Sequence, residues 1–384
     1  MKKKTWAVLV SVAAAVVVGF LTRAVAAPAA PAGPAGAAAG ALQKTYTATV
    51  YVAGHGGHFS KASVTIDPAD AENPIKVKDL DQVVVGQPNS HPLHDGRIDG
   101  NTLYWSTIAR DTEGKIHVGK TDLKTGKVIQ DVALSPDPRS PAATPPAYCA
   151  SGQTKNAFMP VFMGNEAYVD VFNKKTLKHE HRVFVSDLGY KAGSYMFVHG
   201  TNTNDGKRWV VTLTLKGEDG KMNGKQDILL VDLPALEKGK WKVIAKTQLT
   251  GEPGKTIAFR QYFTPDDKLL FQAAADRVWV LDGKTLKLVD EKMTSGYGEN
   301  HDVQPTPDGK FALLTVRASD TVACDADGKP TPDKKITDGQ LVLYDATAKK
   351  LVGKSASVCF GCHKTMGKGD KSAVLCGIAA SFAK

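Results

Sequence analysis

One phrase recurs along the chain and limits its fold more than any other feature. It consists of an apolar run, an Asp or Asn, a turn rich in Lys, Thr and Gly, and a second apolar run. Six copies align at intervals of about 50 to 63 residues, a length that suits four short strands with their turns. The aligned residues are Asp67, Asp122, Asn173, Asp232, Asp282 and Asp345. The repeat therefore predicts a series of similar small sheets.

A second phrase falls between these copies and adds hairpins to the pattern. Residues 307–310 read Pro-Asp-Gly-Lys, and 204–207 and 265–268 are close variants, each followed by strand-like residues. Asp-Gly between apolar runs is a hairpin signal, and no segment after residue 45 shows a sustained helical period. We therefore expect an all-β protein with a β-propeller fold of six blades, with seven as the alternative count. The competing architecture is a pair of β-sandwich domains, in which such regular repetition would be a coincidence.

The two ends of the chain complete each other in this scheme. Residues 358–382 supply an inner strand but no Asp-containing outer phrase, whereas strand-like residues 47–52 and 62–66 stand at the amino end. Pairing the two ends in one blade would close the ring and remove exposed sheet edges. The sequence therefore predicts closure by amino- and carboxyl-terminal strands.

These repeats resemble the broad family of bacterial propellers that includes the YVTN-type repeat proteins, the quinoprotein amine dehydrogenase propellers and the haem d1 domain of nitrite reductase. The resemblance covers about residues 45–384. It implies the fold, but its motifs are shared by many functions and imply no single activity.

A CxxCH string near the carboxyl end carries the clearest chemical signal. Cys359 and Cys362 have the spacing that bonds both vinyl groups of a porphyrin, and His363 follows as a proximal iron ligand. The leading interpretation is one covalently bound haem c. A zinc or copper half-site and a redox-active dithiol are the alternatives. Only 21 residues follow His363, too few for a separate cytochrome c domain, so the propeller itself would have to cover a haem.

The amino end has the layout of an export signal. Residues 1–27 contain three lysines, an apolar run and a small-residue cleavage site, which predicts a signal peptide, with an uncleaved membrane anchor as the alternative. Residues 28–44 are rich in Ala, Pro and Gly, so we expect a disordered spacer before a folded domain at 45–384. The expected location is the periplasm or the cell surface, with no membrane span in the mature chain.

Aligning the repeats on their hairpin turns places several metal-ligating residue types at one position of the innermost strands. These residues are His94, His199, His301 and His363, with Cys149 and Arg260 at the same place in two other repeats. Inner strands line the propeller axis, so the side chains would converge there. Imidazole and thiolate bind transition metals, and Arg260 could hold an anionic group such as a haem propionate. The alternative is that these side chains satisfy backbone groups and channel water.

The remaining His and Cys residues are expected to have different roles. His55 and His58, on a Gly-rich loop, are further candidates to approach a cofactor, unless the loop is simply a mobile surface segment. In contrast, we expect His117, His179 and His181, in or beside outer-strand phrases, to face solvent. After two cysteines are used for haem, three remain in an exported chain, and a disulfide between Cys324 and Cys376 is our hypothesis.

The distribution of charge and the sequence motifs exclude several classes of function. The formal net charge is +10, but the basic residues are spread along the chain and give no nucleic-acid groove. The sequence contains no catalytic triad, phosphate-binding loop or nucleotide fingerprint, so hydrolase or nucleotide chemistry has no support. The leading function is an exported c-type cytochrome that transfers electrons to a redox partner protein. The alternatives are a periplasmic redox enzyme with copper or an open-site haem in the axial His/Cys cluster, and a non-redox binding propeller with a structural metal.

Overall fold

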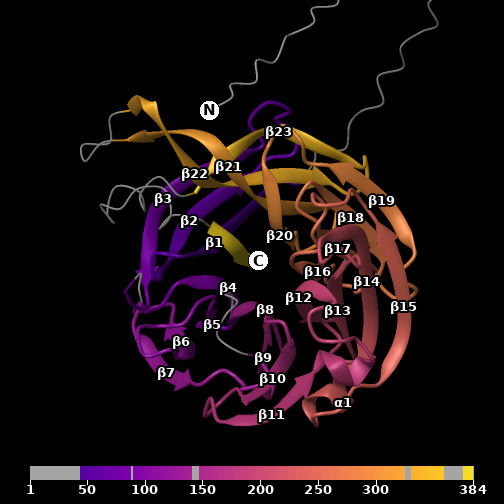
Figure 1. Ribbon diagram of the computed structural model, residues 1–384. Coiled ribbons are helices and arrows are strands. Elements are labelled where there is room, and N and C mark those ends of the chain that lie inside the picture. The colour runs from indigo at the N-terminus through magenta and orange to yellow at the C-terminus, as the bar shows by residue number, and fades with distance from the viewer. Residues whose placement is uncertain (1–43, 88–89, 141–146, 325–329, 359–374, 384) are drawn as a thin grey trace, which may run out of the picture. The chain divides into compact units, whose positions relative to one another are not determined.

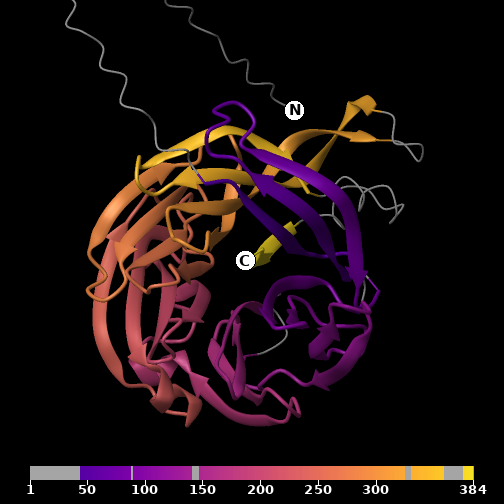
Figure 2. The ribbon, with the colours of Figure 1, turned by 180° about the vertical axis from the view of Figure 1, so that it is seen from behind.

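Six four-stranded antiparallel sheets form a ring of blades, which confirms the predicted six-bladed β-propeller (Figure 1). The computed structural model describes residues 44–87, 90–140, 147–324, 330–358 and 375–383. Within these ranges it describes only the backbone of 319–324, 330–338 and 375–376. Figure 2 shows the same ring from behind, with the outermost strands at the rim.

Three blades take their strands from the first half of the chain, except that the innermost strand of the closing blade is β24 from the carboxyl end. The strands of each blade are given in order from the axis to the rim. The closing blade contains β24 (Leu375–Phe382), β1 (Tyr46–Gly54), β2 (His58–Ile66) and β3 (Ile75–Val84). Blade two contains β4 (Leu93–Asp99), β5 (Thr102–Thr107), β6 (Ile116–Asp122) and β7 (Val128–Leu134). Blade three contains β8 (Tyr148–Gln153), β9 (Ala157–Phe162), β10 (Tyr168–Asn173) and β11 (His179–Phe184).

The other three blades follow the same order. Blade four contains β12 (Tyr195–Asn202), β13 (Arg208–Lys216), β14 (Met222–Asp232) and β15 (Val243–Thr250). Blade five contains β16 (Gln261–Phe263), β17 (Leu269–Ala273), β18 (Arg277–Asp282) and β19 (Leu288–Met293). Blade six contains β20 (Glu299–Pro305), β21 (Phe311–Cys324), β22 (Pro330–Asp345) and β23 (Lys350–Ser357).

The ring is closed by strands from the two ends of the chain, as the sequence predicts. β1 pairs with β24 from Ala48 opposite Phe382 to Gly54 opposite Leu375, and the backbone N–H of Ala383 donates to the carbonyl of Thr47 at 2.9 Å. The first sheet is therefore completed by the last strand, and its inner edge is paired.

The repeated Asp or Asn is the last residue of the third strand in five blades and directly follows that strand in the closing blade, and it builds the next turn. Asp122 Oδ1 accepts hydrogen bonds from the backbone N–H groups of Lys124 and Thr125, and Asn173 and Asp282 make the same pair of bonds two and three residues ahead. A carboxylate or amide side chain that bonds its own backbone in this way stabilises an Asx turn. This local chemistry explains why the phrase recurs once in each blade.

The core lies between neighbouring blades. Six clusters of buried apolar side chains fill the six contacts between adjacent blades, from the closing blade round to blade six. Between blades five and six, for example, the rings of Phe271 and Tyr344 are 6.0 Å apart between centroids. Each fully buried side chain of this size contributes about 1.5 to 3 kcal/mol of hydrophobic stabilisation, so each blade depends on both neighbours.

We call the face at which the innermost strands begin the start face. In a four-stranded antiparallel blade, the outermost strand ends on the face where the next innermost strand begins. The described ends of successive blades therefore meet on the start face, including the end of β23 and the beginning of β24. The pairing of β21 with β22 continues from Phe311 opposite Asp345 to Cys324 opposite Pro330, and this long hairpin projects from the ring in both views (Figures 1 and 2).

Helical structure is minor. A 3-10 helix spans Val185–Leu188, and α1 spans Leu233–Glu237 with Asp232 as its N-cap. Among the described residues, no helix has the length and apolar character that crossing a bilayer requires.

Candidate functional site

Five of the predicted side chains converge on the propeller axis near the start face, and we call them the axial cluster: His94, Cys149, His199, Arg260 and His301. The Cys149 sulfur lies 2.8 Å from His94 Nδ1 and 2.9 Å from His199 Nε2. Arg260 Nη2 lies 2.6 Å from His94 Nδ1 and 3.3 Å from the same sulfur. All five residues are buried. The fold thus brings together these five residues, which are far apart in the chain and which the alignment of the repeats had placed at one position.

A β-bulge places the side chain in three of these strands. The pairing register shifts around His94 in β4, around Cys149 in β8 and around His301 in β20. A bulge adds one residue to a strand and redirects its side chain. The innermost strands therefore share a local irregularity that turns one residue towards the axis.

His301 is held by neighbours of its own. Its ring stacks on Phe259 with 4.0 Å between centroids, and its Nε2 donates to the Glu299 carboxylate. Arg317 of β21 approaches Glu299 at 3.3 Å and His94 Nε2 at 3.2 Å. His301 thus packs at the edge of the axial cluster, and Arg317 contacts both Glu299 and His94.

Burial and positive charge keep the axial imidazoles neutral. Burial, with Arg260 next, lowers the pKa of both His94 and His199 well below the usual range. Burial and then Arg317 lower the pKa of His301 to about 3. A neutral imidazole has a free lone pair that can bind a metal ion, whereas an imidazolium does not.

Two buried carboxyl groups beneath the cluster were not identified from the sequence. Asp95 Oδ1 lies 3.4 Å from Arg260 Nε, and Asp302 Oδ2 accepts the backbone N–H of Ile378 at 2.9 Å. Burial raises the pKa of Asp302 to about 7. The available signal was a repeated His-Asp pair, since Asp95 follows His94 and Asp302 follows His301. Arg317, Glu299 and Phe259 gave no comparable signal.

The Gly-rich loop brings one of its two histidines to the cluster. His55 lies in the turn between β1 and β2, with its ring centroid 5.2 Å from that of His94. Its buried Nε2 atom has no hydrogen-bond partner among the described residues. Burial, then Arg317 and Arg260, lower the pKa of His55 to about 3. His58 is buried at the start of β2, opposite Gly54 and Val84.

Neither the CxxCH string nor the side chains of the predicted disulfide belong to the described parts of the structure. Cys359, Cys362 and His363 lie outside the described residues. The innermost described strand of the closing blade is β24, which does not include His363, and the axial position that the alignment assigned to His363 stays a prediction. The backbone places Cys324 at the tip of the long hairpin and Cys376 in β24, but their side chains are outside the described part, and their disulfide stays a prediction.

One expectation about exposure was wrong. His117, predicted to face solvent, is only 8% exposed, because His91 and Asp111 from two loops cover its ring. His181 is exposed and His179 is half-buried, in agreement with their position in the outermost strand β11.

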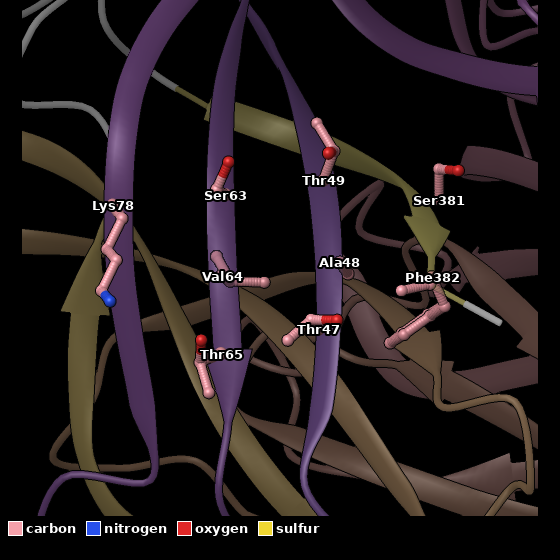
Figure 3. A pocket seen from close by; sticks show the side chains of 10 residues that line it. Thr47, Ala48, Thr49, Ser63, Val64, Thr65, Lys78, Ser381 and Phe382 are labelled. Atoms are coloured by element: carbon pink, nitrogen blue, oxygen red, sulfur yellow. The ribbon is translucent and has the colours of Figure 1, made fainter.

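A pocket of about 370 Å³ lies on the closing blade, away from the axial cluster (Figure 3). Hydroxyl groups of Thr47, Thr49, Ser63 and Thr65 line it, with Lys78 at one side. Thr47 stands near the end of β1 that is opposite to Gly54 and His55. This pocket is therefore not part of the axial site.

Comparison with known proteins gives little beyond the fold. No protein-family model matches the sequence, and no curated protein matches it. Among solved structures, hydrazine synthase from Kuenenia stuttgartiensis is similar, with 17% sequence identity and a TM-score of 0.42. The match covers 69% of this chain and 64% of that chain, so less than two thirds of the solved chain is represented. Likeness at this level carries no argument about the site or its chemistry.

Proposed function

We propose that the chain is an exported c-type cytochrome in which the propeller carries one haem at the start face and transfers electrons to a protein partner. The observation that carries this proposal is the position of the two described residues that flank the CxxCH string. Val358 is buried, its N–H donates to Gly339 at 3.1 Å, and its carbonyl accepts from Ser60 Oγ. Leu375 pairs with Gly54, the residue before His55.

The CxxCH string and the axial histidines have the donor types that a haem requires. Cys359 and Cys362 would form the thioether bonds, and His363 would be the proximal ligand. We assign His55 as the distal ligand, because its imidazole is neutral at pH 7 and its Nε2 is free of hydrogen bonds among the described residues. His301 is a weaker choice, because its Nε2 is already bonded to Glu299.

The arginines support this arrangement in different ways. The Arg317 side chain is 22% exposed and could contact a haem propionate, whereas Arg260 is fully buried and bonded to His94. When bound, the haem supplies one-electron transfer. The two guanidinium groups would favour the less positive, reduced form of a bound haem iron, and the buried residues of the axial cluster would help to exclude water.

An optical spectrum of the mature protein from a host that attaches haem to c-type cytochromes tests the proposal. We expect covalently retained colour with sharp, split bands after reduction and no change with carbon monoxide. Cys359→Ser with Cys362→Ser should remove the covalent colour. A colourless, iron-free wild-type protein would overturn the proposal.

The distal ligand is tested separately. His55→Ala should open the sixth position, so that reduced protein binds carbon monoxide, whereas the control His181→Ala, an exposed histidine on β11, should not. If His55→Ala leaves the spectrum unchanged and still excludes carbon monoxide, the assignment of His55 is wrong, although the haem itself would remain.

A second function is favoured by the contacts of Cys149. A thiolate with two imidazoles is a donor set of copper redox sites, and His94 and His199 lie on either side of the Cys149 sulfur. Arg260, at 3.3 Å, would stabilise negative charge on that sulfur. In this function the axial cluster holds copper in a periplasmic oxidoreductase. Metal analysis decides it: copper present in wild type and lost in Cys149→Ser supports this function, and copper-free wild type excludes it.

A further inference from the structure

Three metal-binding side chains meet in blade two, at a place that the axial cluster does not include. His91 belongs to the connection between β3 and β4, His117 to β6 and Asp131 to β7. His91 Nε2 lies 2.9 Å from Asp131 Oδ2, and His117 Nδ1 lies 3.0 Å from Asp131 Oδ1. Among the described residues, this is the group of three whose possible ligand atoms all lie within 4.8 Å of one another. We call these residues the blade-two triad.

The outer nitrogen of each imidazole is also held by an oxygen atom. His117 Nε2 lies 3.1 Å from Asp111 Oδ2, and His91 Nδ1 lies 2.8 Å from Ser90 Oγ. The backbone N–H groups of Glu113 and Lys115 both donate to Asp111 Oδ1 at 2.8 Å and fix that carboxylate. In metal sites, the second nitrogen of a histidine ligand is held in this way, which orients the ring and sets its tautomer. The inner nitrogens are thus left facing Asp131.

A divalent cation fits this arrangement better than protons alone. The two imidazole rings are 4.3 Å apart between centroids. Two imidazolium charges at this distance would repel each other, and both would share the Asp131 carboxylate, because Asp111 contacts His117 alone. One metal ion could instead accept a lone pair from each ring and an oxygen from Asp131 without adding like charges. Two nitrogen donors and one carboxylate are a usual ligand set for zinc.

The triad is also accessible. The side chains of His91, His117 and Asp131 are 13%, 10% and 32% exposed. Three protein ligands with partial exposure leave a coordination position for water. The triad also joins three separate pieces of chain, so a bound ion would tie the connection before β4 to the outer strands of blade two.

We propose that His91, His117 and Asp131 bind a divalent zinc-type cation, with Asp111 and Ser90 as the groups that orient the two imidazoles. This site is independent of the haem proposal, because it lies on different strands and uses none of the axial residues. Its primary effect would be to stabilise the protein by binding the folded state only.

Zinc titration of the mature full-length protein tests the proposal, with calorimetry for stoichiometry and Kd and thermal melts for stability. We expect one zinc equivalent that raises Tm in wild type and is lost in both His91→Ala and Asp131→Asn. Asp111→Asn should keep the equivalent but raise Kd about 10- to 100-fold, as loss of an orienting partner does.

The matched control is His179→Asn in blade three. His179 also pairs with an aspartate, Asp170, at 2.8 Å, and among the described residues no second imidazole joins this pair. The His179→Asn variant should bind zinc with the stoichiometry and Kd of wild type. Thermal melts in EDTA show whether each variant is folded. If His91→Ala does not fold, Asp131→Asn, which keeps the shape of the side chain, provides the test of zinc binding. Equal zinc stoichiometry in wild type, His91→Ala and Asp131→Asn, or no zinc-dependent rise in wild-type Tm, would overturn the proposal.

Discussion

Asp302 is the axial carboxyl group whose protonation depends most on the fold. It is fully buried, receives the N–H of Ile378, and has a pKa raised from 3.8 to about 7 by burial. Between these two pH values the folded protein binds more protons at this residue than the unfolded chain does. The contribution of Asp302 to stability is therefore fully present below about pH 4 and is lost as the pH rises towards 7.

Asp302→Asn should remove this pH dependence. Asn stays neutral and can still accept the Ile378 N–H, so the variant should gain stability relative to wild type as the pH rises from 4 to 7. The upper limit is about 4 kcal/mol, from three pKa units at about 1.4 kcal/mol each. Denaturant unfolding of both proteins at pH 4.5, 6 and 7.5 measures the difference. A difference that stays constant over this range would contradict the pKa shift.

At the same scale, sequence reasoning located the axial residues more easily than the residues that surround them. The repeat position located His94, Cys149, His199, Arg260 and His301, because one position per blade must face the axis. It did not locate Arg317, which reaches the cluster from the second strand of blade six, where the alignment has no reason to look. His117 was misjudged for a related reason, since loop residues from outside the repeat cover it.

Among the elements, the strands of blade two show how tightly a blade is packed. Gly119 of β6 lies against the Trp105 ring of β5, and a Cβ at this glycine would come within 2.1 Å of that ring. The indole is fully buried and donates to Thr121 Oγ1 at 2.9 Å, so it has little room to move. Glycine is required here by the close approach of a side chain rather than by its φ angle.

Gly119→Ala should therefore destabilise the protein by about 1 to 3 kcal/mol, the usual cost of overpacking a core. Thermal or denaturant unfolding measures the loss. The control is Lys120→Ala, the next residue on the same strand, which removes a hydrogen bond to the Lys175 carbonyl and adds no volume. If the two variants lose the same stability, close packing against Trp105 is not the cause.

Turns could be predicted at this scale, but bulges could not. The Asp or Asn at the end of each third strand is read directly from the sequence, because its side chain bonds the next backbone N–H groups. The bulges at His94, Cys149 and His301 have no comparable signal in the sequence, because they arise from pairing with a neighbouring strand.

In the whole molecule, closure of the ring depends on the pairing of β1 with β24. All six contacts between blades contain a hydrophobic cluster, and two of these belong to the closing blade. The sequence predicted this closure because strand-like residues without a matching phrase stood at both ends. Without β24, the closing blade loses its innermost strand and the ring opens.

Deleting residues 375–384 should therefore abolish cooperative unfolding. Circular dichroism during heating measures it, with loss of the sharp transition as the expected result. The control is a circular permutant that joins residue 384 to residue 44 through a short Gly/Ser linker and opens the turn 217–221 between β13 and β14. Because Ala383 already bonds to Thr47, the permutant should fold with a similar Tm. A truncated protein that melts like wild type would show that closure is dispensable.

The pairing of β1 with β24 also has a consequence for how the protein is made. A nascent chain presents β1, β2 and β3 first, while their missing partner is synthesised last. During that interval β1 displays a row of unpaired N–H and C=O groups, which can template aggregation with any extended peptide nearby. We therefore expect biogenesis, rather than the finished protein, to be the stage that needs a chaperone.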